Sequence, residues 1–338
     1  MESMAASIKE KAIQLGYSAC GIIPAVAFEE YYEALDKRIL SFPNSKEFYE
    51  SQYSRATPPE NARSIVVCIR GYNQYKIPAN LDRYIGKYYL FHGNIPYSTA
   101  FSAKAELDTY LQLLGIRTVK CYPPPMRWAA VKAGLGKFGR NNFVYTPEHG
   151  SYVHIDTWVV DTELDCDSLR DSPITKKCPT SCKKCINACP TKALADEFSM
   201  DRGKCITHLM YEKESLPEEI REQMGLWLYG CDVCQDICPM NKDKLTGTEE
   251  FPLLLQFEKY MELDKIATMK EETYKNIIYP RFWFAGKDAL VTWQCNALRA
   301  MINTKDERYQ QLIQESCFHQ DQRVRRIAKW GYKGNANS

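Results

Sequence analysis

The chain has 338 residues, 45% of them hydrophobic, which is enough for one large or two ordinary domains with their own cores. Its 44 basic and 42 acidic residues leave a net charge of +2, which excludes a global attraction to nucleic acid or membrane and leaves only local patches. No stretch resembles a signal peptide or a membrane span, so we expect a cytoplasmic protein without membrane contact.

Helices and strands alternate in the first half of the chain. Apolar spacing predicts helices at residues 2–15, 101–115 and 126–133 and strands at 18–24, 64–72, 117–122, 143–147 and 152–160. This alternation predicts an α/β domain over residues 1–165, in which helices cover a sheet.

Two further segments follow this domain. Residues 166–245 are rich in Cys, Pro, Lys and Asp and have no strand signal, so they form a second module. Residues 246–338 end in apolar positions at 289–290, 297–302, 312–313 and 324–328, which predict short stacked helices of the HEAT type. Two such units are too few for a free solenoid, so we expect them to pack on the preceding domain. The predicted fold class is α+β.

Eight of the fourteen cysteines stand at metal-ligand spacing. The first run is Cys178, Cys182, Cys185 and Cys189 before Pro190; the second is Cys231, Cys234 and Cys238 before Pro239; Cys205 stands between them. Two-cluster ferredoxins repeat C-x2-C-x2-C-x3-C-P, and the fourth cysteine of each run binds the other cluster. This crossing predicts [4Fe-4S] cluster one on Cys178, Cys182, Cys185 and Cys238, and cluster two on Cys189, Cys205, Cys231 and Cys234.

The match to the ferredoxin pattern has two departures. The first gap has one extra residue, and the first ligand of the second run has moved back to Cys205. A pair of structural zinc sites is the alternative, because C-x2-C pairs also suit tetrahedral zinc. The two x3-C-P endings have no purpose in a zinc ribbon and favour the clusters. The other cysteines are scattered, which is typical of a reducing compartment.

Gly134, Gly136 and Gly139 match the dinucleotide fingerprint G-x-G-x-x-G. That motif needs a strand before it and a helix after it, whereas here a helical segment precedes the glycines and a strand follows. The glycines therefore indicate a tight turn or a close approach of the backbone to a flat ligand.

One histidine and one run of basic residues can each be interpreted in two ways. His208 follows Cys205 by three residues and lies near a cluster, where a hydrogen-bonding role is commoner than ligation. Arg323, Arg325, Arg326 and Lys329 form a basic run near the C-terminus. Such a run is usually a solvated face, and the functional alternative is contact with nucleic-acid phosphates.

Taken in order, several segments resemble the epoxyqueuosine reductase family and, more distantly, reductive dehalogenases. The resemblance rests on residues 61–73, 133–142, 150–151, 189–194, 205–207 and 230–241 and on the HEAT-like end. It implies a nitroreductase/dehalogenase-like α/β domain that binds base-off cobalamin against a ferredoxin-like double-cluster domain. By position it assigns cofactor contacts to Arg127, Gly134, Gly136, Gly139, Asn141, Asn142, Ser151, Thr207, His208 and Asp232.

One position departs from the family. An aspartate general acid is expected three residues before a proline, and here that position is Lys120. A lysine can donate a proton only with a suitable pKa. Lys120, Cys121 and Tyr122 are therefore the candidate catalytic residues, either for the family reaction or for another reduction.

The resemblance implies an oxidoreductase that reduces epoxyqueuosine to queuosine in tRNA, with flavodoxin or ferredoxin as electron donor. We expect a monomer with two [4Fe-4S] clusters and cobalamin. Two alternatives remain: an iron-sulfur or corrinoid electron-transfer protein without substrate chemistry, and a dehalogenase-like reductase of a small organic substrate.

Overall fold

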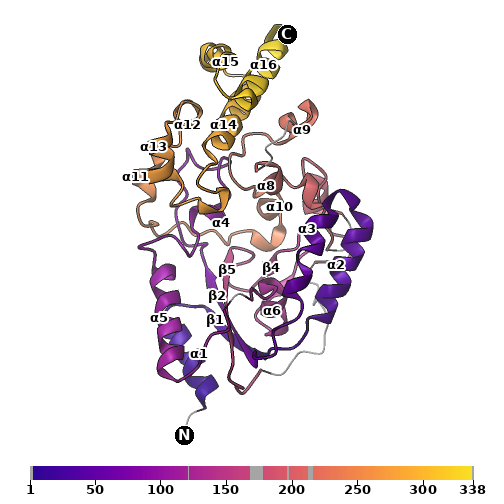
Figure 1. The fold of residues 1–338 in the computed structure, drawn as a ribbon, viewed down its shortest axis with the longest axis vertical. Coiled ribbons are helices and arrows are strands. Elements are labelled where there is room, and N and C mark those ends of the chain that lie inside the picture. Colours follow the sequence, from indigo (N-terminus) through magenta and orange to yellow (C-terminus); the bar gives the residue numbers. More distant parts are fainter. Residues whose placement is uncertain (1–2, 121, 168–177, 196–197, 212–215, 337–338) are drawn as a thin grey trace.

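The computed structural model describes residues 3–120, 122–167, 178–195, 198–211 and 216–336. The molecule is elongated, with the N-terminal α/β part at one end and the C-terminal helices at the other (Figure 1). The cysteine-bearing segment lies between these two parts. In the described part of the chain, no helix combines the length and apolarity needed to cross a bilayer.

The main sheet has three antiparallel strands in the order β1-β2-β5. They are β1 (Ala19–Pro24), β2 (Ser64–Gly71) and β5 (Val153–Val160). Every residue of the central strand β2 is buried, because both faces of the sheet are covered. The strands predicted at 18–24, 64–72 and 152–160 are confirmed.

Alternate side chains of β2 feed two separate cores. Ile65, Val67 and Ile69 pack on one face with α2 (Glu29–Ser41) and α6 (Met126–Lys132). Val66 and Cys68 pack on the other face with α1 (Met4–Gln14) and α5 (Thr99–Leu113). This period of two gives the helix–sheet–helix layering that the sequence predicts.

The strand predicted at 117–122 is wrong. Among the residues of this segment that the structure describes, Thr118 alone makes a bridge, to Val160. Prolines at 123–125 follow, and because proline has no N–H it cannot continue a ladder. The prediction at 143–147 is right for β4 (Val144–Tyr145), but this strand pairs with β3 (Lys137–Phe138) in a separate hairpin.

The other regular elements of the described chain are helices, most of them short. In the first half they are η1 (Pro43–Ser45), α3 (Lys46–Glu50), η2 (Tyr53–Arg55) and α4 (Lys87–Leu90). Around the cysteines they are α7 (Lys184–Ala188), η3 (Arg202–Lys204), α8 (Ile206–Leu209), α9 (Glu218–Gln223), α10 (Val233–Asp236) and η4 (Pro239–Asn241). The C-terminal part has α11 (Leu254–Glu258), α12 (Leu263–Ala267), α13 (Glu271–Thr273), the π-helix η5 (Tyr274–Ile278), η6 (Trp283–Ala285), α14 (Leu290–Thr304), η7 (Glu307–Tyr309), α15 (Gln310–Ser316) and α16 (Gln322–Ala336).

The C-terminal helices pack on the cysteine-bearing segment, as predicted. Trp293 of α14 is buried and stacks on Tyr229, with ring centroids 5.2 Å apart. Asn296 Nδ2 donates to the carbonyl oxygens of Met210 and Leu228 at 3.0 and 3.1 Å. One hydrophobic core therefore runs from Tyr72 to Ala328 along the sequence. The domain boundaries at 165 and 245 stay predictions.

Candidate functional site

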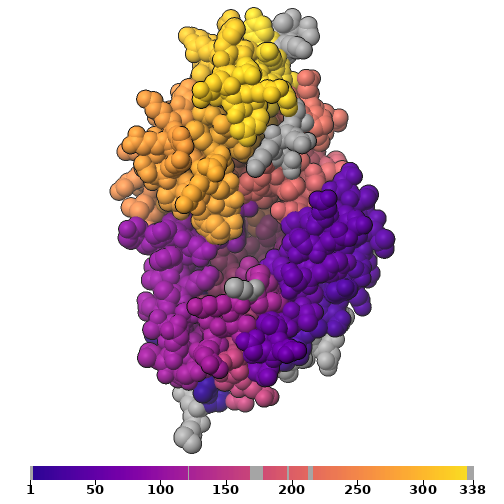
Figure 2. Space-filling view, in the orientation of Figure 1, coloured from indigo at the N-terminus to yellow at the C-terminus, as the bar shows by residue number. Residues whose placement is uncertain are grey.

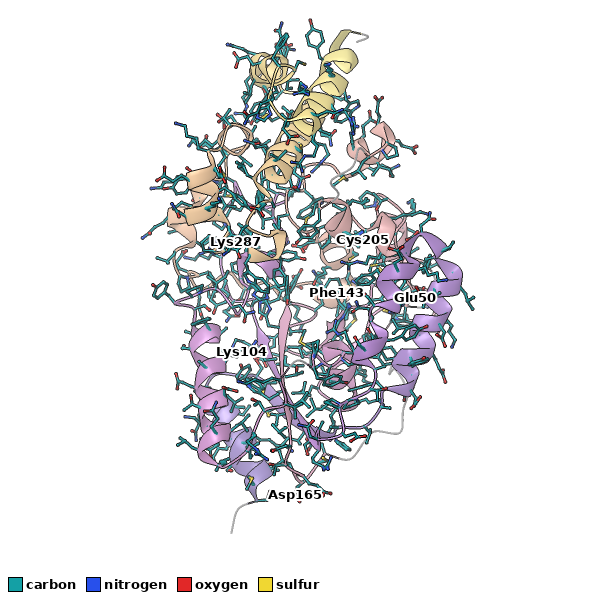
Figure 3. The ribbon with its side chains drawn as sticks, viewed as in Figure 1. Glu50, Lys104, Phe143, Asp165, Cys205 and Lys287 are labelled. Carbon is teal, nitrogen blue, oxygen red and sulfur yellow. The ribbon has the colours of Figure 1, made fainter. Side chains whose placement is uncertain are left out.

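A cavity of about 360 Å³ lies between the α/β part and the cysteine-bearing segment, and we call it the central cavity. Figure 2 shows the molecule hollowed at its middle, between the indigo lobe and the orange lobe. The wall includes Met126 and Arg127 of α6, Val153 and Ile155 of β5, and residues 189–191, 193–194, 205–208 and 231–235. In Figure 3, Phe143 and Cys205, which both line the cavity, lie near the centre of the molecule.

The three glycines of the G-x-G-x-x-G segment shape the β3–β4 hairpin. Gly134 has a φ of +72° and ends α6, where Leu135 N–H donates back to Ala130 O at 3.0 Å. A Cβ on Gly136 would lie 2.4 Å from Val144 Cγ1, and one on Gly139 would lie 2.4 Å from Tyr145 Cε2. The helix α6 precedes the glycines, β3 lies among them and β4 follows them, so the predicted order of helix before strand is confirmed.

The hairpin places two asparagines at the cavity wall. Asn141 Nδ2 donates to Cys234 O at 2.9 Å, which joins the hairpin to the cysteine-bearing segment. Asn142 Oδ1 accepts from Arg38 at 3.0 Å, while Asn142 Nδ2 is buried without a hydrogen-bond partner in the described structure. A buried amide donor without a partner is costly, so it marks a place where a ligand acceptor fits. Gly134, Gly136 and Gly139 do not line the cavity.

The thiols that act on Cys185 and on Cys231 belong to the same predicted groups as these two cysteines, while the full ligand sets stay predictions. Burial, followed by the neighbouring thiols of Cys178, Cys238 and Cys182, raises the pKa of Cys185 to about 11. Burial also raises the pKa of Cys231, and the nearby thiols of Cys205 and Cys189 add to it. The second group, Cys189, Cys205, Cys231 and Cys234, lines the central cavity. The first group does not line it, so the two predicted clusters differ in their access to this space.

Hydrogen-bond donors reach several of these sulfur atoms. Ala193 N–H donates to Cys189 Sγ at 3.2 Å, and Arg140 N–H donates to Cys178 Sγ at 3.4 Å. Burial raises the pKa of Cys205, and hydrogen bonds from Thr207 lower it by a smaller amount, so that the net shift is upward. Such N–H···S and O–H···S contacts stabilise thiolates and tune cluster potentials.

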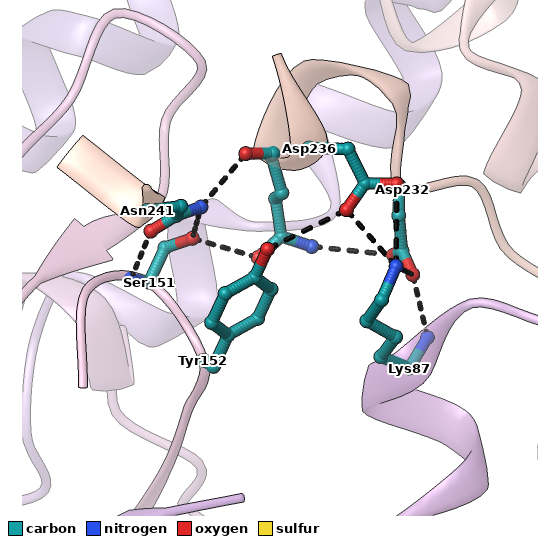
Figure 4. Close-up of polar contacts among 7 residues, drawn as sticks. Lys87, Ser151, Tyr152, Asp232, Asp236 and Asn241 are labelled. Carbon is teal, nitrogen blue, oxygen red and sulfur yellow. Dashed lines mark hydrogen bonds and ion pairs between the residues drawn. The ribbon is translucent and has the colours of Figure 1, made fainter. Parts of the chain in front are cut away.

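A buried ion cluster ties α4 to the loop after Cys231 (Figure 4). Lys87 Nζ lies 3.3 Å from Asp232 Oδ2 and 2.9 Å from Asp236 Oδ1. Lys87 N–H also donates to Asp232 Oδ2 at 2.7 Å. Burial alone would lower the pKa of Lys87, but the two carboxylates together raise it. Burial raises the pKa of Asp232 to about 6 in spite of Lys87. The cluster fixes Tyr88 and Tyr89, which line the cavity.

A second polar network in Figure 4 joins Ser151 to the end of the cysteine-bearing segment. Ser151 N–H donates to Asn241 Oδ1 at 2.9 Å, and Ser151 Oγ donates to Gln235 Oε1 at 2.9 Å. Asn241 Nδ2 donates to Ser151 Oγ and to Gln235 O, both at 2.8 Å. Gln235 Nε2 donates a hydrogen bond to Asp232 Oδ1 at 3.3 Å, which extends this network to the ion cluster. This network holds one wall of the cavity against the other.

The structure brings together seven of the ten predicted cofactor contacts on the wall of the central cavity. They are Arg127, Asn141, Asn142, Ser151, Thr207, His208 and Asp232. Sequence reasoning missed Tyr88, Tyr89, Met200 and Arg202, which also line it. Tyr88 and Tyr89 are neighbours in α4, and Met200 and Arg202 lie just before and in η3, but no motif marks either pair.

The two candidate catalytic residues that the structure describes, Lys120 and Tyr122, are not on this wall. Lys120 is exposed in a turn, and Cys121 lies outside the described residues. The Tyr122 hydroxyl donates to Arg55 O at 2.8 Å, and its ring packs in the α/β core. Burial raises the pKa of Tyr122 to about 12. In this structure Lys120 and Tyr122 therefore lie apart from the space that the cysteines face.

Comparisons with known proteins agree with the iron–sulfur chemistry that the cysteines of the site suggest. Residues 177–241 match the family of 4Fe-4S double cluster binding domains. An epoxyqueuosine reductase from Cellulophaga algicola is 31% identical over 248 residues, which cover 70% of this chain and 78% of that protein. The chain belongs to the epoxyqueuosine reductase family. A second family member, from Cyclobacterium marinum, is 29% identical over 80% of this chain and 88% of its own.

Solved structures of the family share the fold. A crystal structure of epoxyqueuosine reductase with an epoxyqueuosine-modified stem loop of tyrosine tRNA aligns with a TM-score of 0.76 and 25% identity, over 96% of this chain and 88% of that one. The Streptococcus thermophilus enzyme aligns with a TM-score of 0.78 at 20% identity, over 99% of this chain and 91% of its own, which supports the fold.

Membership of the family has consequences for the earlier predictions. The α+β fold class and the double-cluster domain are confirmed, and the zinc alternative is set aside. An oxidoreductase with two [4Fe-4S] clusters and cobalamin is the activity class that the epoxyqueuosine reductase family implies. The individual ligand, cofactor-contact and catalytic residues stay predictions.

Proposed function

We propose that this chain reduces epoxyqueuosine to queuosine in tRNA, with cobalamin bound in the central cavity. The observation that carries the proposal is that Cys189, Cys205, Cys231 and Cys234 line the same cavity as Arg127, Asn142 and Thr207. A cluster held by these thiolates would face a cofactor held by the other wall. That arrangement suits electron delivery, and the cofactor carries the hard chemistry.

The residues of the cavity fit such a cofactor. Asn142 Nδ2 offers an unpartnered buried donor, and Met126, Val153 and Ile155 offer apolar surface. When bound, cobalamin supplies a cobalt centre that is strongly nucleophilic in its reduced state. The chain would hold the macrocycle between α6 and the 205–208 segment and keep bulk water away from it. Cluster one, farther from the cavity, would accept electrons from an external donor such as flavodoxin or ferredoxin.

Reduction of an epoxide to an alkene consumes two electrons and two protons and releases the oxygen as water. A proton donor must therefore reach the cavity. Tyr88 lies on the wall and is protonated at neutral pH, although burial raises its pKa to about 12 and so makes it a weaker acid than a free tyrosine. Its ring is fixed between His154 and His92, at centroid distances of 4.7 and 5.2 Å. We assign Tyr88 as the proton donor that substitutes for the missing aspartate.

Complementation tests the function directly. The gene, expressed in a bacterial strain that lacks epoxyqueuosine reductase, should restore queuosine in tRNA, measured by mass spectrometry of tRNA digests. Cys205→Ala should fail, whereas Cys166→Ala, at an exposed cysteine outside both groups, should succeed. Persistent epoxyqueuosine despite good expression and full iron content would refute the tRNA substrate.

A second candidate is the reduction of a small organic substrate. It is favoured by Lys120, which stands where the family has an aspartate. Salt-dependent binding of a tRNA stem loop separates the two, because a small-molecule enzyme should show none.

A further inference from the structure

The thiols predicted to hold cluster one lie close to the molecular surface. Cys178, Cys182 and Cys238 are half-buried, and none of them lines the central cavity. Their exposed surface therefore faces another side of the molecule than the cavity does. An electron that enters from outside should arrive at this group, because electron transfer slows steeply with distance and the other predicted cluster faces the cavity.

The β3–β4 hairpin covers one side of this group of thiols. Arg140 N–H donates to Cys178 Sγ at 3.4 Å, and the Arg140 guanidinium donates to Thr180 O at 2.7 Å. Tyr145, which is buried, is hydrogen-bonded to Cys238. Elsewhere the group is bounded by α7 and by the end of α10, which pack against each other.

An exposed isoleucine stands directly beside this group. Ile237 follows α10 and precedes Cys238, and it is 46% exposed. Pro179 and Pro239, which follow Cys178 and Cys238, are exposed as well. Protein partners that exchange electrons meet over small interfaces, and an interface commonly has an apolar centre and a polar rim. Ile237 is placed to be such a centre.

The charged side chains around Ile237 are mostly basic. Lys183 and Lys184 stand between two of the predicted ligands, and both are exposed. Lys242 stands four residues after the last ligand and is exposed too. Together with Arg140 and Ile237, these lysines form a surface that we call the basic face.

Few carboxylates oppose the charge of the basic face. Asp232 and Asp236 both pair with Lys87. In segments 178–189 and 231–245, which the structure describes throughout, Asp243 is the one other carboxylate, against four lysines. The whole chain has 44 basic and 42 acidic residues, so this positive charge is a local concentration. A surface of this kind attracts acidic partners and raises their rate of encounter.

We propose that the basic face docks a small acidic flavoprotein that delivers electrons to cluster one. The charge of the face selects an acidic partner. A flavin presents the apolar edge of its ring, which fits against Ile237, and for this reason we assign a flavin carrier rather than an iron–sulfur carrier. The inference rests on the proposed function, in which an external donor reduces cluster one.

The electrons balance over two encounters. In each encounter the anionic flavin hydroquinone of the donor gives up one electron, keeps its proton and becomes a neutral radical. The oxidised cluster accepts that electron, and no bond to this chain forms or breaks. Two such transfers supply the two electrons that reduction of an epoxide to an alkene consumes.

The test measures binding of a flavodoxin to the cluster-loaded full chain by anaerobic calorimetry, at low and at high salt. Lys184→Glu and Lys242→Glu are the charge variants, because both side chains are exposed and neither is a predicted ligand. Ile237→Ala tests the apolar centre. Lys287→Glu is the matched control, because Lys287 is an exposed lysine in the C-terminal part of the chain, outside the basic face.

Each charge variant should weaken flavodoxin binding by about tenfold at low salt, and the difference should shrink at high salt, where charges are screened. Ile237→Ala should weaken binding at both salt concentrations, because its contribution is apolar. Lys287→Glu should bind as the wild type does. Every variant should keep about eight irons, which shows that a loss of binding does not come from a loss of clusters.

Three results would overturn the inference. They are wild-type affinity in both charge variants, an equal loss in Lys287→Glu, and a ferredoxin that binds as tightly as the flavodoxin with the same dependence on the lysines. Failed complementation with lysine-dependent flavodoxin binding intact would reject the tRNA substrate alone. Successful complementation with flavodoxin binding that ignores Lys184 and Lys242 would reject the basic face alone.

Discussion

Replacement of Lys87 by methionine tests the buried ion cluster that fixes the cavity wall. The side chains of Lys87 and Asp232 are only 5% and 3% exposed, and their charged atoms lie 3.3 Å apart. At an effective dielectric constant of about 20, this separation gives an attraction of roughly 5 kcal/mol, part of which offsets the desolvation of both ions. Asp236 adds little, because its side chain is 43% exposed.

The variant leaves Asp232 buried without its cation, so the free energy of unfolding should fall by about 3–5 kcal/mol. Anaerobic urea unfolding of the cluster-loaded protein measures this loss. Lys76→Met is the matched control, because the Lys76–Glu250 pair has a similar distance of 2.9 Å but both side chains are 54% exposed. That control should lose at most about 1 kcal/mol. Adding Asp232→Asn to Lys87→Met should restore part of the stability. Equal losses in Lys87→Met and Lys76→Met would refute the reasoning.

Other substitutions test the site, the core and the buried histidines. Tyr88→Phe should slow substrate reduction by about 10²-fold without weakening cobalamin binding. The control Tyr97→Phe, on a side chain that is 82% exposed, should not change the rate. Equal rates in the two variants would exclude Tyr88 as the proton donor. Trp293→Ala should lower the free energy of unfolding, measured in urea, by about 3–5 kcal/mol. Phe318→Ala, at a side chain that is 86% exposed, should lower it very little. A small loss for Trp293→Ala would show that its stacking on Tyr229 contributes little to stability. Burial lowers the pKa of His154 to about 3, whereas the pKa of a histidine in the unfolded chain is about 6.5. The unfolded state therefore binds more protons than the folded state between these values, and the free energy of unfolding should fall as the pH drops below about 6.5. His154→Gln, which keeps a donor for Phe91 O, should flatten this dependence, and an unchanged slope would contradict it.

The features that the sequence predicts well are those with a strict local pattern. The strands β1, β2 and β5 are predicted correctly because each contains a run of buried apolar residues. The double-cluster domain follows from the spacing of two short cysteine runs, and a family model matches residues 177–241. The segment at 117–122 has the same strand-like composition, but only the following prolines decide against it.

The features that the sequence does not predict depend on long-range contacts. Lys87 meets Asp232 across 145 residues, and neither position has a motif. A second cavity is lined by one arginine from each of four elements, Arg38 of α2, Arg55 of η2, Arg127 of α6 and Arg202 of η3. Of these, only Arg127 is among the cofactor contacts that the resemblance to the family implies. Such sites are created by the packing of separate elements, and no single stretch of sequence records them.

Cobalamin binding together with iron analysis tests the central claim most directly. The anaerobically purified chain should contain about eight irons and bind one cobalamin. Cys205→Ala should retain about four irons, and Asn142→Leu should keep all of the iron but bind cobalamin weakly. A wild-type protein with about eight irons that binds no added cobalamin would contradict the account and would favour an electron-transfer protein instead.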